Sequence, residues 1–198
     1  MSNNFDPNIP STGPGTPSIE GQFTTVKIAE QPALGKSNLV INGGRPFDIE
    51  IAWNFKGNLT PLWLTALSVD TKEWVVTAYA NPRGPGNGLT LGSVNVPIGG
   101  PPFGDPEAYT AKLTVPANTL PEEDPGNPNN SGVYQLTVTV FLDSDLGPVG
   151  FDMMGVADFP LVKVENPDMG LSTTAFSPVT AAPYRQLRGA QPGTVPPM

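Results

Sequence analysis

Cysteine and histidine are both missing from this 198-residue sequence. Without cysteine, the chain has no disulfide, no thiolate nucleophile and no cysteine–zinc site. Without histidine, Ser-His-Asp and Cys-His catalysis and the common zinc sites lack their imidazole. These absences argue against most hydrolase chemistry, and we expect a protein that is not an enzyme and carries no cofactor.

Positive charge and long apolar runs are also scarce. The 10 basic residues face 18 acidic ones, and the net charge of −8 argues against nucleic acid or an anionic membrane as a partner. Residues 1–7 have neither a basic nor an apolar region of the kind that begins a signal peptide, and no apolar run is long enough to cross a bilayer. We expect cytoplasmic synthesis and, if the protein is found outside the cell, transport on a particle such as a virion.

Glycine and proline are abundant instead, with 22 and 25 copies that gather at the two ends and in turns. Residues 1–21 are rich in Asn, Pro, Ser, Thr and Gly, which predicts an extended N-terminal arm. Residues 167–198 show no hydrophobic period and predict a Pro-rich C-terminal arm. The folded domain is therefore expected over residues 22–166.

The clearest structural signal is a period of two over residues 132–142. Every second residue from Tyr134 to Leu142 is apolar, and the residues between them include Gln135, Thr137 and Thr139. Such a strand buries one face and needs a second sheet to pack against. Similar patterns predict further strands at 22–29, 38–41, 46–55, 62–69, 73–79, 89–96, 108–115 and 151–165.

Several details of strand placement follow from these patterns. Segments 62–69 and 73–79 are expected to form a hairpin, with 62–69 apolar on both faces. Segment 89–96 is expected at an edge of the sheet. The last strand is interrupted near Gly155 and Pro160, which suits an edge strand with a bulge. Short connections predict antiparallel pairing throughout, and the fold class is an all-β sandwich.

The run Asn130-Ser131-Gly132-Val133-Tyr134 resembles the Asp-x-Gly-x-Tyr stretch of immunoglobulin-like domains. The resemblance covers about residues 22–166 and implies an immunoglobulin-like antiparallel β-sandwich with extended N- and C-terminal arms. It also implies that Tyr134 is the tyrosine-corner residue, whose hydroxyl caps the preceding corner. The chain departs from the family by having Asn130 where Asp is usual, a long preceding loop and no disulfide.

The same resemblance places four residues in the structural core. Leu136 stands where immunoglobulin domains carry their second cysteine, and Ile49 or Ile51 stands where they carry the first. Trp63 falls where the tryptophan of strand C is expected. The expected core residues are therefore Ile51, Trp63, Tyr134 and Leu136.

Two groups of carboxylates have both a functional and a structural interpretation. Asp143, Asp145 and Asp152 could bind calcium at one end of the sandwich, but the EF-hand ligand pattern is absent and aspartates also cap loops. Asp48 and Glu50 share the outward face of a strand and could serve a glycosidase. Exposed carboxylates on a strand more often prevent edge-to-edge pairing, so we expect neither a metal site nor a catalytic pair.

Aromatic residues could also form a platform for sugar rings. The candidates Trp53 and Trp63 fit the core better, while Trp74 and Tyr79 have opposite parities and cannot share one face of a regular strand. The glycine-rich segment 84–88 lacks the lysine and the strand–helix context of a phosphate loop, and is expected to be a loop tip.

The arms lead to the functional hypothesis. We expect a non-catalytic structural or interaction protein that packs into or decorates a larger assembly, such as a capsid, tail, filament or injection apparatus. The partner would be protein, either further copies of the chain or a host assembly, bound through the apolar residues of the arms: Phe5, Ile9, Phe176, Tyr184 and Leu187. The alternative is a glycan- or ligand-binding sandwich, with an exposed aromatic cluster near Asp or Asn.

Overall fold

A computed structural model describes residues 3–30, 39–70, 72–124, 126–127, 129–145 and 152–165. These residues form nine strands and one short helix in the following order: β1 (Asn3–Asp6), β2 (Glu20–Glu30), β3 (Val40–Asn42), β4 (Phe47–Lys56), α1 (Thr60–Leu67), the 3-10 turn η1 (Ser68–Asp70), β5 (Glu73–Pro82), β6 (Leu89–Pro97), β7 (Glu107–Val115), β8 (Val133–Leu142) and β9 (Met153–Glu165). Within the described residues, no helix has the length and apolar character needed to cross a membrane.

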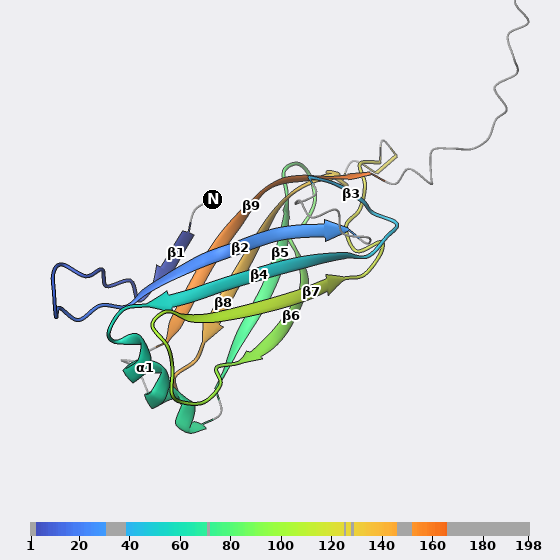
Figure 1. The fold of residues 1–198 in the computed structure, drawn as a ribbon. Coiled ribbons are helices and arrows are strands. Elements are labelled where there is room, and N and C mark those ends of the chain that lie inside the picture. Colours follow the sequence, from blue (N-terminus) through green and yellow to red (C-terminus); the bar gives the residue numbers. More distant parts are fainter. Residues whose placement is uncertain are drawn as a thin grey trace, which may run out of the picture.

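The strands form two sheets that pack face to face (Figure 1). The larger sheet has the order β1-β9-β8-β5-β6, with β3 also paired to β9, and the smaller sheet has the order β2-β4-β7. At one side β6 approaches β7, and at the other β1 approaches β2. The predicted all-β sandwich is therefore confirmed at the level of two packed sheets.

Strand β8 lies in the middle of the larger sheet and follows its sequence pattern closely. Its inward residues are all buried, and its other residues are only partly covered. Burial of one face in this way is the main stabilising contribution to the sandwich, at about 25 cal/mol per Å² of apolar surface removed from water. The inward residues of β8 are Tyr134, Leu136, Val138, Val140 and Leu142.

The prediction of a strand at 62–69 is wrong, because this segment forms helix α1 and the turn η1. Pro61 lies in the first turn of the helix, where its missing N–H is not needed. Buried Thr60, Leu64 and Leu67 recur at intervals of four and three residues, which places them on one helical face. The expected hairpin between 62–69 and 73–79 does not exist, and β5 pairs with β6 and β8.

Trp63 is therefore not the tryptophan of a strand. It lies on α1, partly buried against the edge of the core. Trp74 on β5 and Trp53 on β4 are the fully buried tryptophans, and their ring centroids lie 5.8 Å apart. Ile51, which was expected in the core beside Trp63, is 2% exposed on β4.

The last strand, β9, is not an edge strand. It pairs with β8 on one side and with β1 and β3 on the other, and its pairing with β3 is parallel, which corrects the expectation of antiparallel pairing throughout. The expected irregularity exists where Pro160 interrupts the register with β8, between the pairs Gln135↔Leu161 and Thr137↔Asp158. Proline has no N–H to donate to either neighbour, so the ladder shifts around it.

The N-terminal segment differs from the expected extended arm. Residues 3–6 form β1, and Phe5 is 7% exposed inside its own sandwich rather than free to reach a partner. Ile9 forms an isolated antiparallel bridge with Ile19 and is 44% exposed. The C-terminal arm residues Phe176, Tyr184 and Leu187 lie outside the described residues.

Candidate functional site

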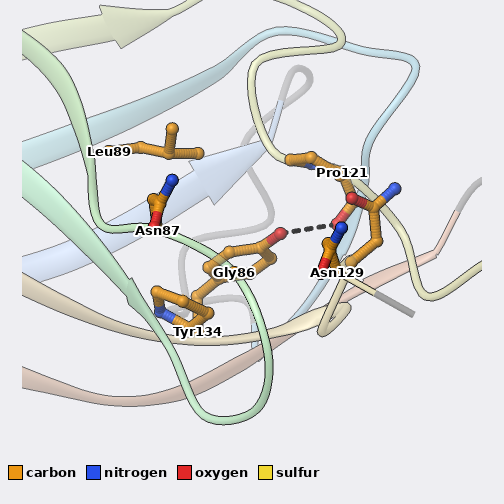
Figure 2. Close-up of a pocket in the computed structure, with 8 residues that line it drawn as sticks. Gly86, Asn87, Leu89, Pro121, Asn129 and Tyr134 are labelled. Carbon is orange, nitrogen blue, oxygen red and sulfur yellow. Dashed lines mark hydrogen bonds between the residues drawn. The ribbon is translucent and has the colours of Figure 1, made fainter. Parts of the chain in front are cut away.

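A pocket of about 460 Å³ opens at the end of the sandwich farthest from α1 (Figures 1 and 2). Its wall residues come from four places: the end of β5, the loop to β6 with the start of β6, the long loop before β8, and the start of β8. Its lining consists of Pro82, Gly86, Asn87, Leu89, Pro121, Asn129, Asn130 and Tyr134.

Tyr134 fixes the floor of this pocket. Its hydroxyl donates a hydrogen bond to the carbonyl oxygen of Pro121, at 2.9 Å, as Figure 2 shows. Burial raises the pKa of the Tyr134 phenol, so the hydroxyl stays a hydrogen-bond donor at neutral pH. The side chain is 3% exposed and presents little ring surface to a ligand.

The loop between β5 and β6 packs against the segment before β8. The backbone N–H of Arg83 donates to the carbonyl oxygen of Val133, at 2.9 Å, and its guanidinium donates to the side-chain oxygen of Gln135, at 2.7 Å. The glycine-rich segment 84–88 is thus a loop tip, as the sequence indicated, and it forms one wall of the pocket.

The chemistry of the pocket is neutral. Three asparagines, Asn87, Asn129 and Asn130, supply amide groups that can both donate and accept hydrogen bonds. None of the lining side chains is charged at neutral pH. This wall could orient a small polar ligand, and the phenol of Tyr134, the titratable group of the lining, is buried and donates to Pro121.

A second candidate is the outward face of the larger sheet. Val75, Phe141 and Met154 lie side by side in one row across β5, β8 and β9. Val75 is 38% and Met154 is 42% exposed, and Phe141 is partly exposed between them. We call these three residues the outer row.

Hydroxyl side chains flank the outer row on one side, and Asn95 and Asp6 lie at its two ends. Thr77, Thr139 and Val156 form the next row of the sheet, and the hydroxyls of Thr77 and Ser93 lie 3.0 Å apart. This part of the face therefore combines large apolar groups with small uncharged ones, which is the composition of the central part of many protein interfaces.

The aspartates considered for calcium do not converge on one point. The backbone N–H and the hydroxyl of Ser144 both donate to Oδ1 of Asp152, at 2.9 and 2.8 Å, and they lower the pKa of that carboxyl. Asp143 accepts from the backbone N–H of Asp145, and Lys72 pairs with Asp145 and lowers its pKa. Across the part of the chain that the structure describes, no three acidic side chains form a metal-binding group.

The outward carboxylates of β4 form ion pairs rather than a catalytic pair. Asp48 is 3% exposed, which differs from the exposed position expected for it, and it accepts from Lys112 and Thr114, each at 2.7 Å. Glu50 pairs with Lys27 at 2.8 Å. Both carboxylates therefore have a structural partner of their own.

The aromatic candidates are separated as their parity predicted. Trp74 is fully buried and Tyr79 is 36% exposed on the outward face of the same strand. Trp53 stacks on Tyr109 inside the core, with ring centroids 5.6 Å apart. These residues do not share an exposed platform for a sugar.

Sequence reasoning missed both candidate surfaces. The pocket residues come from two distant loops, and the outer row comes from three strands that are adjacent only in space. For the outer row a signal did exist, because Val75, Phe141 and Met154 are large apolar residues at polar-face positions of their strands.

No protein-family model matches the chain, and no curated protein matches it.

Proposed function

We propose that this chain is a non-catalytic structural or interaction protein that packs into or decorates a larger assembly. The observation that carries the proposal is the outer row, Val75, Phe141 and Met154, which keeps large apolar side chains at the surface near the ends of the three central strands of the larger sheet. A sheet face that is exposed to solvent usually carries polar side chains at such positions.

The most direct partner for this face is the same face of a second copy. An isologous contact needs only one self-complementary patch, and a flat sheet with small hydroxyl neighbours can approach its own copy closely. The net charge of −8 opposes association at low ionic strength. At physiological salt the screening length is about 8 Å, so this repulsion becomes short-ranged.

The experiment is sedimentation velocity on the full chain over a concentration range up to about 100 µM, where contacts of modest affinity become populated. We expect the wild type to associate and Val75→Lys/Met154→Lys to remain monomeric. The matched control is Leu62→Lys/Val69→Lys, which adds the same charge at two residues that are 68% and 79% exposed near α1. Association that survives the first double substitution, or a wild type that stays monomeric, would overturn the proposal.

An immunoglobulin-like identity for the sandwich is part of this proposal. The sheet β2-β4-β7 and the neighbours β5-β8-β9 divide the strands as A-B-E and C-F-G are divided in that fold. The hydrogen bond of Tyr134 fits a tyrosine corner, and Trp74 on β5 takes the place that the sequence assigned to Trp63. Helix α1 between β4 and β5 is an addition to the usual pattern.

A glycan- or ligand-binding module is the second candidate, and the three asparagines of the pocket favour it. Amide groups recognise neutral hydroxyl-bearing ligands by paired hydrogen bonds. A glycan array should then show binding by the full chain that Asn87→Ala/Asn129→Ala removes. Asn8→Ala, an exposed asparagine on the loop before β2, is the control.

A further inference from the structure

Strand β1 is held to the sandwich by its pairing with β9 and by one buried aromatic ring. Phe5 lies in the middle of β1, and its ring centroid is 4.7 Å from that of Phe23 on β2 and 5.3 Å from that of Phe55 on β4. Among the side chains of β1 that the structure describes, Phe5 is the buried one, and Asn4 and Asp6 are exposed.

Two glycines shape the space that the ring fills. A Cβ atom placed on Gly155 of β9 would lie 2.3 Å from Cε1 of Phe5, and one placed on Gly21 of β2 would lie 2.4 Å from its Cγ. Two carbon atoms that are not bonded to each other cannot lie this close, so both positions must lack a side chain while the ring is present. We call this space, bounded by Gly21, Gly155, Phe23 and Phe55, the Phe5 socket.

The rest of the N-terminal segment is weakly attached. Residues 7–19 connect β1 to β2, with prolines at positions 7, 10, 14 and 17, and most of residues 7–17 are exposed. In Figure 1 this connection projects away from the two sheets. Its contacts with the body lie near its C-terminal end, where the amide groups of Asn58 bond to Ser18 and Thr16.

Opening this connection would release β1 from its own chain and expose the Phe5 ring. The two hydrogen bonds between Ile9 and Ile19, at 2.8 and 2.9 Å, would be lost, as would the pairing of β1 with β9. The nine residues 7–15, which precede the bonds of Thr16 and Ser18 to Asn58, reach roughly 30 Å when extended at about 3.3 Å each, which lets β1 reach an adjacent copy.

We propose that the Phe5 socket and the adjoining edge of β9 are an assembly site that accepts β1 of a second copy. In this exchange the Phe5 ring of one chain fills the socket of the other, and β1 of one chain pairs with β9 of the other. The contacts are the same as those within one chain, so no new contact surface is required. The inference rests on the proposed role in assembly and names a second contact, which adjoins the outer row because Met154 pairs with Asp6 of β1.

The chain's lack of cysteine allows a direct test. Asn4 and Val156 are antiparallel neighbours on the exposed side of β1 and β9, and such neighbours lie within the Cα distance that a disulfide needs. Full-length Asn4→Cys and Val156→Cys chains are mixed, incubated and oxidised. The products are analysed on non-reducing gels, and peptide mass spectrometry identifies the linked positions.

The control pair is Asn4→Cys mixed with Thr139→Cys. Thr139 lies beside Val156 on β8, one strand farther from Asn4. Strand exchange predicts at least about tenfold more mixed disulfide for the 4–156 pair than for the 4–139 pair, because only the first pair has disulfide geometry. Adding Phe5→Ala to the Asn4→Cys chain should reduce the 4–156 product to the level of the control.

Equal yields for the two pairs would overturn the inference. A second variant, Asn4→Cys/Val156→Cys in one chain, is oxidised at low concentration to hold β1 in its own socket, and should form no exchanged species until it is reduced. Association that depends on the outer row but gives no excess of the 4–156 product would leave the proposed function standing and refute strand exchange. A 4–156 product together with association that does not depend on the outer row would support strand exchange and rule out the outer row as the contact between copies.

Discussion

The hydroxyl of Tyr134 lies 2.9 Å from the carbonyl oxygen of Pro121 and donates a hydrogen bond to it. This bond joins the start of β8, the central strand of the larger sheet, to the loop that precedes it. The loop also carries Asn129 and Asn130 of the pocket wall. Tyr134 therefore ties one point of this loop to the sheet, beside backbone bonds such as those of Asn118 to Gly43 and Val164 to Gly132.

Tyr134→Phe should keep the buried ring and lose only this bond. Removing a buried hydrogen bond and leaving its acceptor unpaired costs about 1 kcal/mol in the free energy of unfolding, with a range of roughly 0.5–3. Urea unfolding of the full chain measures this change. Tyr79→Phe, at an exposed tyrosine of the same sheet, is the matched control, and an equal effect of the two substitutions would contradict the assigned role.

Stability should fall at alkaline pH because of Tyr109. This side chain is 6% exposed, and its hydroxyl donates to the carbonyl oxygen of Ile98 at 3.2 Å. Burial raises the pKa of the Tyr109 phenol far above its usual value of about 10, and the carboxylate of Glu107 adds to the shift. In the unfolded chain the phenol loses its proton first, so the folded state binds more protons above pH 10 and its stability decreases as pH rises.

Tyr109→Phe should therefore flatten the alkaline part of the stability profile. The free energy of unfolding is measured by denaturant titration at a series of pH values from about 8 to 11, on either side of the phenol's usual pKa. Tyr134→Phe, which removes a second phenol with a raised pKa, should flatten the profile as well. An unchanged slope in Tyr109→Phe would show that another group controls the alkaline loss.

The ion pair between Lys112 and Asp48 should matter more than a similar pair beside it. Asp48 is buried and accepts from Lys112 and Thr114, whereas Glu50 is 34% exposed where it pairs with Lys27. Removing a cation from a buried carboxylate leaves a charge that water cannot solvate, while an exposed carboxylate is readily solvated. Lys112→Met should thus lower the melting temperature more than Lys27→Met, and the reverse order would contradict this reasoning.

Much of the sandwich follows from alternating burial, but helix α1 does not. The period of two in β4, β7 and β8 is read directly from sequence because one face of each strand is covered by the opposite sheet. Residues 62–69 are apolar on both parities, and a short apolar run of this kind fits a buried strand as well as a helix. Pro61 in the first helical turn was the local signal that favours the helix.

The prediction for the N-terminal segment differs from the structure for another reason. Four residues are too few to show a period, and the Pro- and Gly-rich connection that follows dominates the composition of residues 1–21. Phe5 becomes a core residue only because Gly21 and Gly155, which are distant in sequence, leave space for it. The pocket likewise depends on how two loops approach each other, which composition does not determine.

The close fit of Phe5 against Gly155 leads to a prediction about stability. Gly155→Ala should force the ring out of its socket, because the new methyl group would overlap it, and overpacking of this kind costs about 1–3 kcal/mol. Hydrogen exchange at residues 3–6 should accelerate in this variant, since β1 would separate from β9. Gly100→Ala, at a glycine with no atom within 4 Å of the added methyl group, is the control.

A double-mutant cycle separates this steric effect from a general loss of order in β9. In the Phe5→Ala background the ring is absent, so Gly155→Ala should cost much less than it does in the wild type. A coupling free energy near zero would mean that the methyl group disturbs β9 itself and that the ring is not its main obstacle. A large coupling would mean that the Phe5 ring occupies the space beside Gly155, which is the space that β1 of a second copy would fill in strand exchange.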